Sequence, residues 1–310
     1  MDAHIVILNY NGIDILRRYL PKVVEEAGRS VHNVKVTVLD NKSSDSSVRY
    51  IKENFPSVNV AVSARNLVLA SYNDFLKTVP ESVVFLLNND TYMAPGCIDS
   101  MIERFKDDSV FVVAPKVLDA EGKNVTGGCM NISVRAGLFR NELKSTEKND
   151  YTLFIGSTAA YKREKFLALG GYDPIYLPGT FEDMDLCYRA WQKGWFCVYE
   201  EKAVAYHEDS VSFKKVYGDK KRQAISARNA YIFVWKNIHD VTILLSNILS
   251  FLPLFLFNIL RLRFDLAAGS LNVIALLPKV LARRKEAAVC IARTDREIKA
   301  LFGNNIKKEL

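Results

Sequence analysis

The sequence predicts an α/β fold in which a mainly parallel central sheet is flanked by helices. Its apolar content of 49% and charged content of 25% are those of an ordinary globular chain. Across the first 115 residues, short apolar runs alternate with amphipathic segments, which is the βαβ rhythm of a doubly wound, Rossmann-like sheet. The expected strands are His4–Leu8, Val34–Leu39, Val58–Val62, Val83–Leu87 and Val110–Ala114, and the expected helices include Ile13–Glu26 and Ser46–Asn54.

The second half of the chain is less regular. Residues 116–160 are rich in Gly, Asn and Ser and predict loops and hairpins, followed by a short helix at 163–169. The segment FEDMDLCYRAWQKGW predicts a helix that runs to Lys193 and stops at Gly194. Two short strands, FCVY and AVAY, follow it. The Lys-rich stretch KKVYGDKKR then predicts a mobile loop, and helix resumes near Gln223.

The net charge of +7 is concentrated at the C-terminal end, where residues 261–310 hold 11 Lys or Arg and five Asp or Glu. A basic tail indicates an anionic surface, either membrane lipid or nucleic acid. Here the charges alternate with Leu, Ile and Ala rather than with stacking aromatics, so we expect no nucleic acid. The five cysteines include no C-x-x-C pair and indicate a reducing compartment. The start, HIVILNYNG, is too short and too little basic for a signal peptide.

Residues 241–260 carry no charge and are long enough to cross a bilayer. Several polar residues and Pro253 interrupt the run, and a second uncharged run at 266–278 is too short to cross in a straight helix. Basic residues flank both, which favours helices lying in an anionic membrane interface at 241–285. A spanning helix at 241–260 and a buried helical hairpin are the alternatives.

Polar side chains follow three of the predicted strands. They form the groups Asn9-Tyr10-Asn11, Asp40-Asn41-Lys42-Ser43 and Asn88-Asn89-Asp90. Ordinary turn chemistry explains any one of them. Because ligands bind beyond the carboxyl ends of strands in such sheets, three together indicate a polar ligand.

Three carboxylates, Glu182, Asp183 and Asp185, open the helix near 182. The first turn of a helix favours acidic residues, which accounts for one or two of them. Asp183 and Asp185 are two residues apart and point about 200° from each other on a helix, so both cannot face one substrate group.

These segments stand in the order seen in one enzyme family. They are VILNYNG, DNKSSD (with Asp40 and Asp45), LLNNDT, GSTAAYKREKFLALGGYDP, FEDMDLCYRAWQKGW, Arg228-Asn229 and Lys236-Asn237. From about residue 4 to 237 the chain resembles the family-2 glycosyltransferases of GT-A fold, particularly the rhamnosyltransferase-like branch of bacterial surface polysaccharide synthesis. The resemblance implies a glycosyltransferase domain at 1–238 and a C-terminal helical, membrane-associating extension at 239–310. Within the domain, 1–115 is the nucleotide-sugar-binding half and 116–238 the acceptor and catalytic half.

The resemblance also implies which residues bind the donor. LLNNDT resembles the family's D-x-D metal motif with Asn88 in place of the first Asp, and His207 falls where the family often has a metal-binding His. Asp90 and His207 are therefore the expected ligands of Mg²⁺ or Mn²⁺, which accept few protein ligands and keep phosphate or water in their shell. The residues expected to contact the nucleotide sugar are Asn9, Tyr10, Asn11, Asp40, Asn41, Asn66, Asn88, Asn89 and Asp90.

The implied reaction is inverting transfer of a sugar from a UDP- or dTDP-sugar, dTDP-rhamnose among them, to a hydroxyl of a glycan or lipid-linked acceptor. The metal neutralises the leaving diphosphate, and a carboxylate accepts the proton of the hydroxyl. Asp183 matches the family's base, while Glu182 and Asp185 either orient the acceptor or bond into the neighbouring loop. The expected location is the cytoplasmic face of the inner membrane, as a peripheral or monotopic protein. The oligomeric state is left open.

One segment departs from the family pattern. ARNLVLASYND at 64–74 stands where the family is glycine-rich, and Val68, Ser71 and Tyr72 replace glycines. A branched side chain and an aromatic there are expected to narrow or reshape the donor pocket. This departure supports the alternative hypothesis, a catalytically weak or inactive GT-A-fold scaffold or partner subunit at the membrane. A nucleotidyltransferase is disfavoured, because NYNGIDILRR has a single glycine after the first strand.

Overall fold

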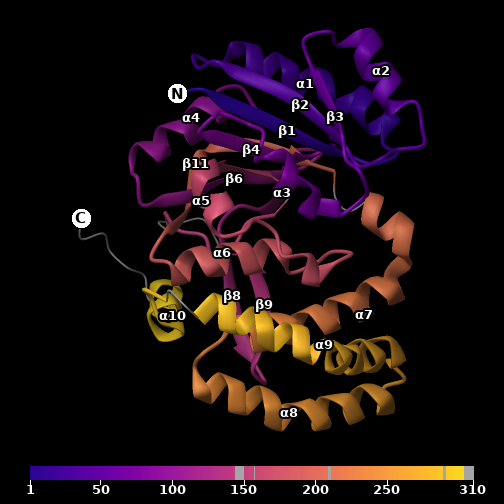
Figure 1. Cartoon of the computed structure of the whole chain (residues 1–310), viewed down its shortest axis with the longest axis vertical. Coiled ribbons are helices and arrows are strands. Elements are labelled where there is room, and N and C mark those ends of the chain that lie inside the picture. Colours follow the sequence, from indigo (N-terminus) through magenta and orange to yellow (C-terminus); the bar gives the residue numbers. More distant parts are fainter. Residues whose placement is uncertain (144–149, 157, 209–210, 289–290, 304–310) are drawn as a thin grey trace. The chain divides into compact units, whose positions relative to one another are not determined.

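The computed structural model describes residues 1–143, 150–156, 158–208, 211–288 and 291–303 (Figure 1). The chain divides into two compact units, which we describe separately. Unit 1 comprises Met1–Met130, Leu143–Tyr172 and Trp195–Asp209, and unit 2 comprises Asn131–Glu142, Asp173–Gly194 and Ser210–Leu310. This is a division by packing, and the functional boundaries at 115 and 238 remain predictions.

Unit 1 is built on one sheet. Its strands are β1 (Ala3–Asn9), β2 (Val34–Asp40), β3 (Asn59–Val62), β4 (Val83–Asn88), β5 (Thr91–Met93), β6 (Val110–Asp119), β7 (Val125–Gly127), β10 (Thr158–Lys162) and β11 (Phe196–His207). Its helices are α1 (Ile13–Arg29), α2 (Ser47–Asn54), α3 (Tyr72–Phe75), α4 (Cys97–Glu103) and α5 (Arg163–Ala168), with 3₁₀ turns at Val68–Ser71 and Arg104–Lys106.

Among the described residues, the strand order is β3-β2-β1-β4-β10-β6-β11-β5, with β7 paired to β6. The four strands from β3 to β4 are parallel, as the βαβ rhythm predicts. β10 then enters antiparallel to both β4 and β6, and β11 returns parallel to β6. The α/β prediction is confirmed, and the sheet is parallel in its first half and mixed in its second.

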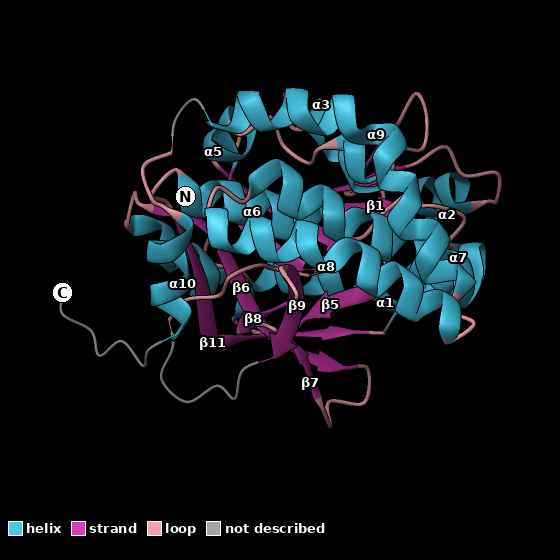
Figure 2. Cartoon of the chain, turned by 90° about the horizontal axis from the view of Figure 1, so that it is seen from below, coloured by secondary structure: helices cyan, strands magenta, loops and turns pink. Residues whose placement is uncertain are grey.

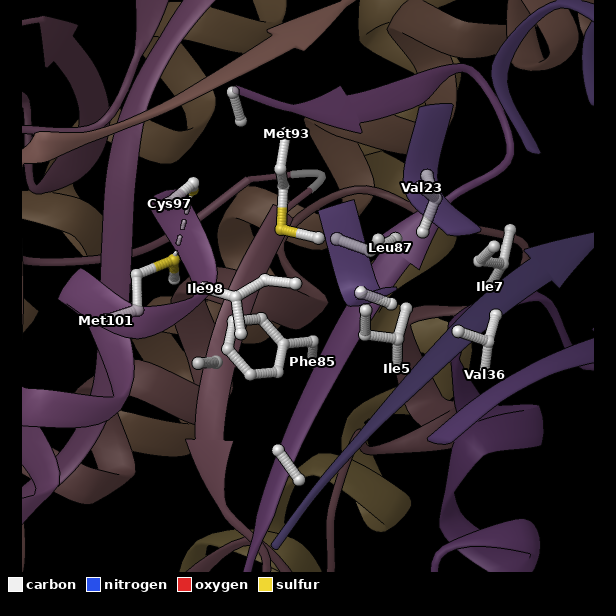
Figure 3. Close-up of a cluster of buried hydrophobic side chains, with 14 of the residues drawn as sticks. Ile5, Ile7, Val23, Val36, Phe85, Leu87, Met93, Cys97, Ile98 and Met101 are labelled. Atoms are coloured by element: carbon white, nitrogen blue, oxygen red, sulfur yellow. Dashed lines mark hydrogen bonds between the residues drawn. The ribbon is translucent and has the colours of Figure 1, made fainter. Parts of the chain in front are cut away.

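The core of unit 1 lies between this sheet and the helices that cover it. Figure 3 shows side chains of β1, β2 and β4 meeting those of α1 and α4, among them Ile5, Phe85 and Ile98. Both Ile5 and its neighbour Val6 are fully buried, so β1 is covered on its two faces. A strand buried on both faces reads as a continuous apolar run, which is why HIVIL was recognisable from sequence.

Two sequence expectations are corrected. FCVY and AVAY form one strand, β11, because an irregularity between Glu200 and Val204 shifts its register on β6 without ending the pairing. The Lys-rich stretch predicted as a mobile loop is helical and belongs to α7 (Val211–Asn237), with a non-helical break at Gly218 (φ 68°, ψ 167°). Glycine supplies this conformation without steric strain, so one residue interrupts the helix without ending it.

Unit 2 contains the paired strands β8 (Met130–Arg135) and β9 (Leu138–Leu143), the 3₁₀ turn Pro174–Tyr176, and five helices among the described residues. The helices are α6 (Glu182–Gln192), α7 (Val211–Asn237), α8 (Val241–Leu260), α9 (Phe264–Ala288) and α10 (Asp295–Gly303). α9 packs along α7 and also contacts α8, and the helices of this unit are labelled in Figure 2. The predicted helical C-terminal extension is therefore present.

Candidate active-site residues

Polar groups gather where β1, β2 and β4 end. The three strands are neighbours in the sheet, and Asn9 is in register with Asp40. Asn9 Nδ2 donates to Asp40 Oδ1 at 2.9 Å, and Asn89 Nδ2 donates to Asn9 Oδ1 at 2.8 Å. All three side chains are buried. The predicted clustering of strand-end polar groups thus takes the form of a hydrogen-bonded row across three strands.

Asp40 uses both of its oxygens within the protein. Oδ1 also accepts from Ser43 Oγ at 2.6 Å, and Oδ2 accepts from the Ser43 backbone N–H at 2.8 Å. The neighbouring Asn41 is buried and donates to the Val68 carbonyl at 3.2 Å. Both residues therefore shape the loop that follows β2. Of the predicted nucleotide contacts at this edge, Tyr10 and Asn11 are the exposed ones.

Gly12 is required by this packing. A Cβ atom at Gly12 would lie 2.1 Å from Asn89 Nδ2 and 2.6 Å from Asn9 Oδ1. The close approach is what allows α1 to start directly behind the polar row, where the N–H of its first residue, Ile13, donates to Asp45 Oδ2 at 3.0 Å.

Asp90 and His207 lie together in unit 1. β5 begins at Thr91 and pairs antiparallel with β11, so Thr91 is opposite His207. Asp90 Oδ1 is 3.2 Å from His207 Nε2, and the two side chains are 6% and 14% exposed. Asp90 Oδ1 is buried and accepts no hydrogen bond from the described residues.

These two atoms fit a hard divalent cation. In an octahedral site, two adjacent ligand atoms that each lie about 2.1 Å from the metal are roughly 3.0 Å apart. This is close to the 3.2 Å between Asp90 Oδ1 and His207 Nε2. Within the described ranges no three His, Cys, Asp or Glu side chains lie close enough together to hold a metal ion, so a cation bound by Asp90 and His207 would take its other ligands from water or substrate. This is the arrangement that phosphate-binding Mg²⁺ or Mn²⁺ sites use.

Glu208 anchors the end of β11 beside this pair. Its carboxylate accepts from Tyr19 Oη at 2.6 Å and pairs with Arg18 at 2.8 Å, while its N–H donates to the Asp90 carbonyl at 3.0 Å. Burial and the hydrogen bond to Glu208 raise the pKa of Tyr19 to about 12. Sequence reasoning missed Glu208 and Tyr19, since a contact across 189 positions has no local signal.

Val68 and Tyr72, two of the residues that replace family glycines, have different structural surroundings. Val68 has φ +51°, the left-handed conformation that favours glycine, and its N–H donates to Asn66 Oδ1 at 2.9 Å. A β-branched residue in this region is strained. Tyr72 is 1% exposed and its hydroxyl donates to the Leu87 carbonyl at 2.8 Å. The ring of Tyr72 is therefore buried in the core and does not narrow a pocket, and a reshaping of the donor pocket by these replacements stays a prediction.

The acidic helix α6 starts at Glu182, as predicted, with Glu182, Asp183 and Asp185 in its first turn. Glu182 and Asp183 are half-buried and Asp185 is fully buried. Burial, together with repulsion from Asp185, outweighs a backbone hydrogen bond and raises the pKa of Glu182 to about 7. The three carboxylates therefore differ in environment, and Asp185 is the one enclosed by protein.

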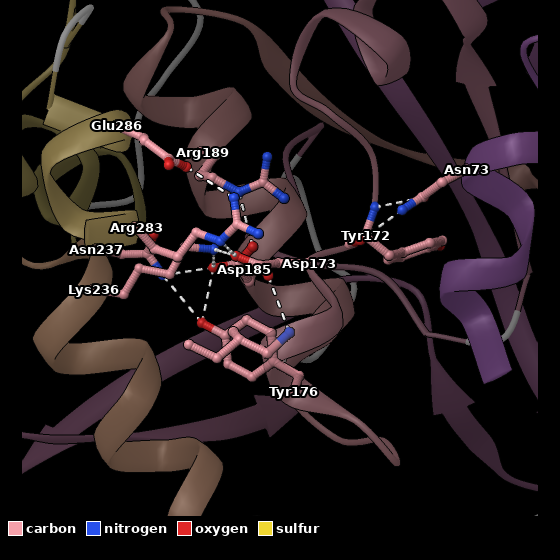
Figure 4. Close-up of polar contacts among 11 residues, drawn as sticks. Asn73, Tyr172, Asp173, Tyr176, Asp185, Arg189, Lys236, Asn237, Arg283 and Glu286 are labelled. Carbon is pink, nitrogen blue, oxygen red and sulfur yellow. Dashed lines mark hydrogen bonds and ion pairs between the residues drawn. The ribbon is translucent and has the colours of Figure 1, made fainter. Parts of the chain in front are cut away.

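Asp185 is the centre of a buried polar network (Figure 4). Oδ1 accepts from Tyr176 Oη, Lys236 Nζ and Asn237 Nδ2 at 2.7–2.8 Å, and Oδ2 accepts from Arg189 Nε at 2.8 Å. Burial alone would raise the pKa of Asp185, but the charges of Arg189 and Lys236 and these hydrogen bonds lower it well below its usual range. Asp185 thus bonds into the neighbouring loop, one of the two roles that the sequence allowed for it.

α8 presents a long apolar face. Two helices, α8 and α9, are long and apolar enough to cross a membrane, and within their most apolar windows 6% and 28% of residues are buried. The large exposed side chains of α8 recur at helical spacing: Val241, Leu245, Ile248, Leu249, Leu252, Leu256 and Leu260. Such a stripe on the outside of a protein marks an interaction surface.

The mixed central sheet flanked by helices is that of the GT-A-fold class of α/β proteins. Residues 4–170 match the family model described as glycosyl transferase family 2. The match covers more than half of the chain, so the chain belongs to that family.

Solved structures with the same fold support the assignment. GalNAc-T7 with UDP, GalNAc and Mn²⁺ has a TM-score of 0.60 at 17% identity, covering 78% of this chain and 48% of its own. The mannosyltransferase PcManGT from Pyrobaculum calidifontis, with GDP-Man and Mn²⁺, has a TM-score of 0.54 at 15% identity, covering 96% and 78%. TarS 1–349 of S. aureus with UDP-GlcNAc has a TM-score of 0.55 at 14% identity, covering 80% and 70%. At these identities the likeness shows the shared fold.

A curated relative, the uncharacterized protein y4gI of Sinorhizobium fredii, is 24% identical over 230 residues. The aligned region is 67% of this chain and 24% of that protein, so the chain spans about a quarter of the relative's length.

Proposed function

We propose that this protein transfers a sugar, with inversion, from a UDP- or dTDP-sugar to a hydroxyl of a glycan or lipid-linked acceptor. The observation that carries the proposal is the buried Asp90 Oδ1, 3.2 Å from His207 Nε2, at the edge of a family-2 sheet. Structural neighbours bind UDP, UDP-GlcNAc or GDP-Man, two of them with Mn²⁺. Among the donors, dTDP-rhamnose is suggested by the branch that the sequence resembles.

Each part of the proposed reaction is assigned to particular residues. Asp90 and His207 would hold a divalent cation, which supplies positive charge to the diphosphate of the donor. The row of Asn9, Asp40 and Asn89 fixes the loops that receive the nucleotide, and Tyr10 offers an exposed ring to its base. Asp183 accepts the proton of the acceptor hydroxyl while the hydroxyl oxygen bonds to the anomeric carbon of the donor. The bond between the anomeric carbon and the oxygen of the donor's diphosphate breaks in the same step. The products are the glycoside and the nucleoside diphosphate, and no enzyme-bound sugar forms.

Asp183 is preferred as the base over its neighbours. Asp185 is fully buried and bonded by four side chains, so it presents no surface to a substrate. Glu182 has one carboxylate oxygen, Oε2, that is buried, and this burial raises the pKa of the group. Asp183 lies in the same first turn and is half-buried, which leaves part of the residue exposed.

The alternative, a weak or inactive scaffold, rests on the lost glycines. Tyr72 is directed into the core and Ser71 accepts a hydrogen bond from Leu67 N–H at 3.2 Å, so both have structural reasons to be present. Val68 remains the single replacement that leaves the alternative any support, because it keeps a glycine-like backbone.

We also propose that α8 lies in the plane of an anionic membrane, on its cytoplasmic face. Asn247, in the middle of α8, is fully buried; its Oδ1 accepts from Trp235 Nε1 at 2.8 Å, and its Nδ2 donates to the Gly137 carbonyl at 3.3 Å. A spanning helix would have to give up both bonds and expose Asn247 to lipid. An in-plane helix keeps them and inserts its outer apolar stripe, while Arg261 and Arg263 meet lipid phosphates.

Donor binding tests the catalytic proposal. Calorimetry with a panel of UDP-, dTDP- and GDP-sugars in Mn²⁺ is expected to show one nucleotide bound, at least about tenfold more weakly after chelation of the metal or in Asp90→Asn. Asp108→Asn, an exposed carboxylate elsewhere in unit 1, is the matched control and should bind like wild type. No binding to any nucleotide by the folded protein would favour the scaffold alternative.

Vesicle sedimentation tests the membrane proposal. Leu249→Glu with Leu252→Glu is expected to abolish binding to vesicles containing phosphatidylglycerol, since both side chains are at least 60% exposed on α8. Val31→Glu, which changes an equally exposed apolar residue in unit 1, should bind normally. Equal binding of all three proteins would refute the role of α8.

A further inference from the structure

The chain that enters the acidic helix is strained. Thr180 and Phe181 both have φ +71°, and Gly179 before them has φ +151°. Two successive non-glycine residues in the left-handed region persist only where surrounding contacts impose them. Phe181 also occupies the N-cap of α6, where it provides no side-chain hydrogen bond to the first turn. The position of Glu182 and Asp183 therefore depends on something other than helix capping.

Asn229 of α7 holds this strained segment. Its fully buried amide nitrogen lies 2.8 Å from the Tyr176 carbonyl, 2.7 Å from the Gly179 carbonyl and 2.9 Å from the Thr180 carbonyl. The two N–H groups of one amide are thus shared among three carbonyls, of which the Tyr176 carbonyl also accepts from the Gly179 N–H at 3.0 Å. Losing the amide would leave buried carbonyl groups with fewer donors, which is costly.

Arg228 fixes the orientation of that amide. Its Nε donates to Asn229 Oδ1 at 2.9 Å, which turns the amide nitrogen toward the loop. Its Nη2 donates to the Leu177 carbonyl at 2.6 Å. Together the two side chains contact four carbonyls between Tyr176 and Thr180.

The same helix holds the other side of the acidic cluster. Lys236 follows Asn229 by seven residues and so lies on the same face of α7, two turns away. Lys236 and Asn237 donate to Asp185, three residues beyond Glu182. Glu182 and Asp183 are therefore flanked by a segment tied to Asn229 and by a carboxylate tied to Lys236.

We propose that Arg228 and Asn229 are positioning residues that set the direction of the Asp183 carboxylate by imposing the strained backbone at Gly179–Phe181. They act through the backbone and touch neither donor nor acceptor. The inference rests on the proposed role of Asp183. When the amide is removed, the segment relaxes toward ordinary backbone angles and the first turn of α6 rotates with it, while the donor residues of unit 1 are unaltered.

The test compares Asn229→Ala with Ser226→Ala, a half-buried position on α7 next in sequence to neither Arg228 nor Asn229. In Asn229→Ala we expect the kcat of transfer to fall about 10²-fold, the loss that a misplacement of about 1 Å produces. The Kd for the nucleotide sugar should stay within about twofold of wild type. Because the surroundings of Glu182 change, the pH profile of kcat should shift as well. Ser226→Ala should match wild type in all three measurements.

A second variant and a second readout keep the test decisive. If Asn229→Ala does not fold, Arg228→Lys retains the charge but cannot bond the amide and the loop together, and it should show the same split between kcat and Kd to a smaller degree. Hydrogen exchange of the amides at 179–185 should become faster in either variant, with the rest of unit 2 unchanged.

The outcomes separate this inference from the proposed function. A wild-type protein that binds no donor and transfers no sugar contradicts the proposed function, yet hydrogen exchange still decides whether Asn229 holds the segment. Unchanged exchange at 179–185, unchanged kcat, or an equal loss of kcat and donor affinity in Asn229→Ala would overturn the inference.

Discussion

Replacing Lys236 with methionine perturbs the network around Asp185 at one point. The Lys236 side chain is 3% exposed, and its Nζ lies 2.7 Å from Asp185 Oδ1 and 2.7 Å from Asp173 Oδ2. Methionine keeps most of the length of the side chain and removes the charge. Asp185 then retains Arg189, and Asp173 retains Arg283 at 3.7 Å.

The expected effect follows from burial. Removing one partner of a buried ion pair typically costs about 3–5 kcal/mol, because the other charge stays desolvated. Since Arg189 still neutralises Asp185, we expect the lower end, about 3 kcal/mol of unfolding free energy at pH 7. The pKa of Asp185 is lowered in the folded protein, its own burial being outweighed by Arg189 and Lys236. The stabilisation from this carboxylate is therefore full above the unfolded pKa, about 3.9, and falls as the pH drops below it.

Urea unfolding followed by circular dichroism, at pH 7 and near pH 3, measures both the size and the pH dependence. Arg49→Met removes an exposed ion pair with Glu53 and is the matched control, expected to change stability by less than about 1 kcal/mol. A loss below about 1 kcal/mol in Lys236→Met at pH 7, or a loss of equal size at pH 3, would refute the electrostatic reasoning.

Three further predictions concern single positions. Gly12→Ala should lower stability by about 1–3 kcal/mol and weaken donor binding, because its Cβ would lie 2.1 Å from Asn89 Nδ2. Thermal unfolding measures the first effect and calorimetry the second. Unchanged stability and binding would show that the side chains of Asn9 and Asn89 can shift to make room. Val68→Gly should stabilise by up to about 1 kcal/mol, because relief of the strain at φ +51° exceeds the added unfolded-state entropy; destabilisation in urea would contradict this. Glu182 has a folded pKa raised to about 7, mainly by burial, so this carboxyl alone should lower wild-type stability by roughly 3 kcal/mol as the pH rises from 4 to 8. In Glu182→Gln this contribution is absent, and parallel pH profiles for the two proteins would contradict the shift.

Much of unit 1 could be predicted from sequence because its strands are buried on both faces. A run such as HIVIL or VVFLL is recognisable as a central strand of an α/β sheet. The observed β1 extends one residue beyond the prediction at each end, and β4 extends one residue beyond it at its C-terminal end. The strand-end polar groups were recognisable for the same reason. Parallel neighbours bring their carboxyl ends to one edge whatever the details of the loops.

What could not be predicted depends on contacts between distant segments. The sequence shows Tyr72 where glycine is expected, but its direction is set by the carbonyl of Leu87. The hydrogen bonds from Asn229 to the segment 176–180 join positions about 50 residues apart in the sequence. The left-handed backbone angles of Thr180 and Phe181 cannot be recognised from the residue types at these positions. The stretch KKVYGDKKR in α7 has only two apolar residues, Val216 and Tyr217, followed by Gly218, so its own pattern does not identify it as helix.

Release of nucleoside diphosphate by wild type and by Asp183→Asn, at equal donor occupancy and with acceptor present, tests the central claim most directly. The account predicts that Asp183→Asn binds the donor with Mn²⁺ as wild type does, because Asp90 and His207 are unchanged, and that its transfer rate falls by about 10²–10⁴-fold. Transfer by Asp183→Asn at the wild-type rate would contradict the assignment of the base and, with it, the proposed mechanism.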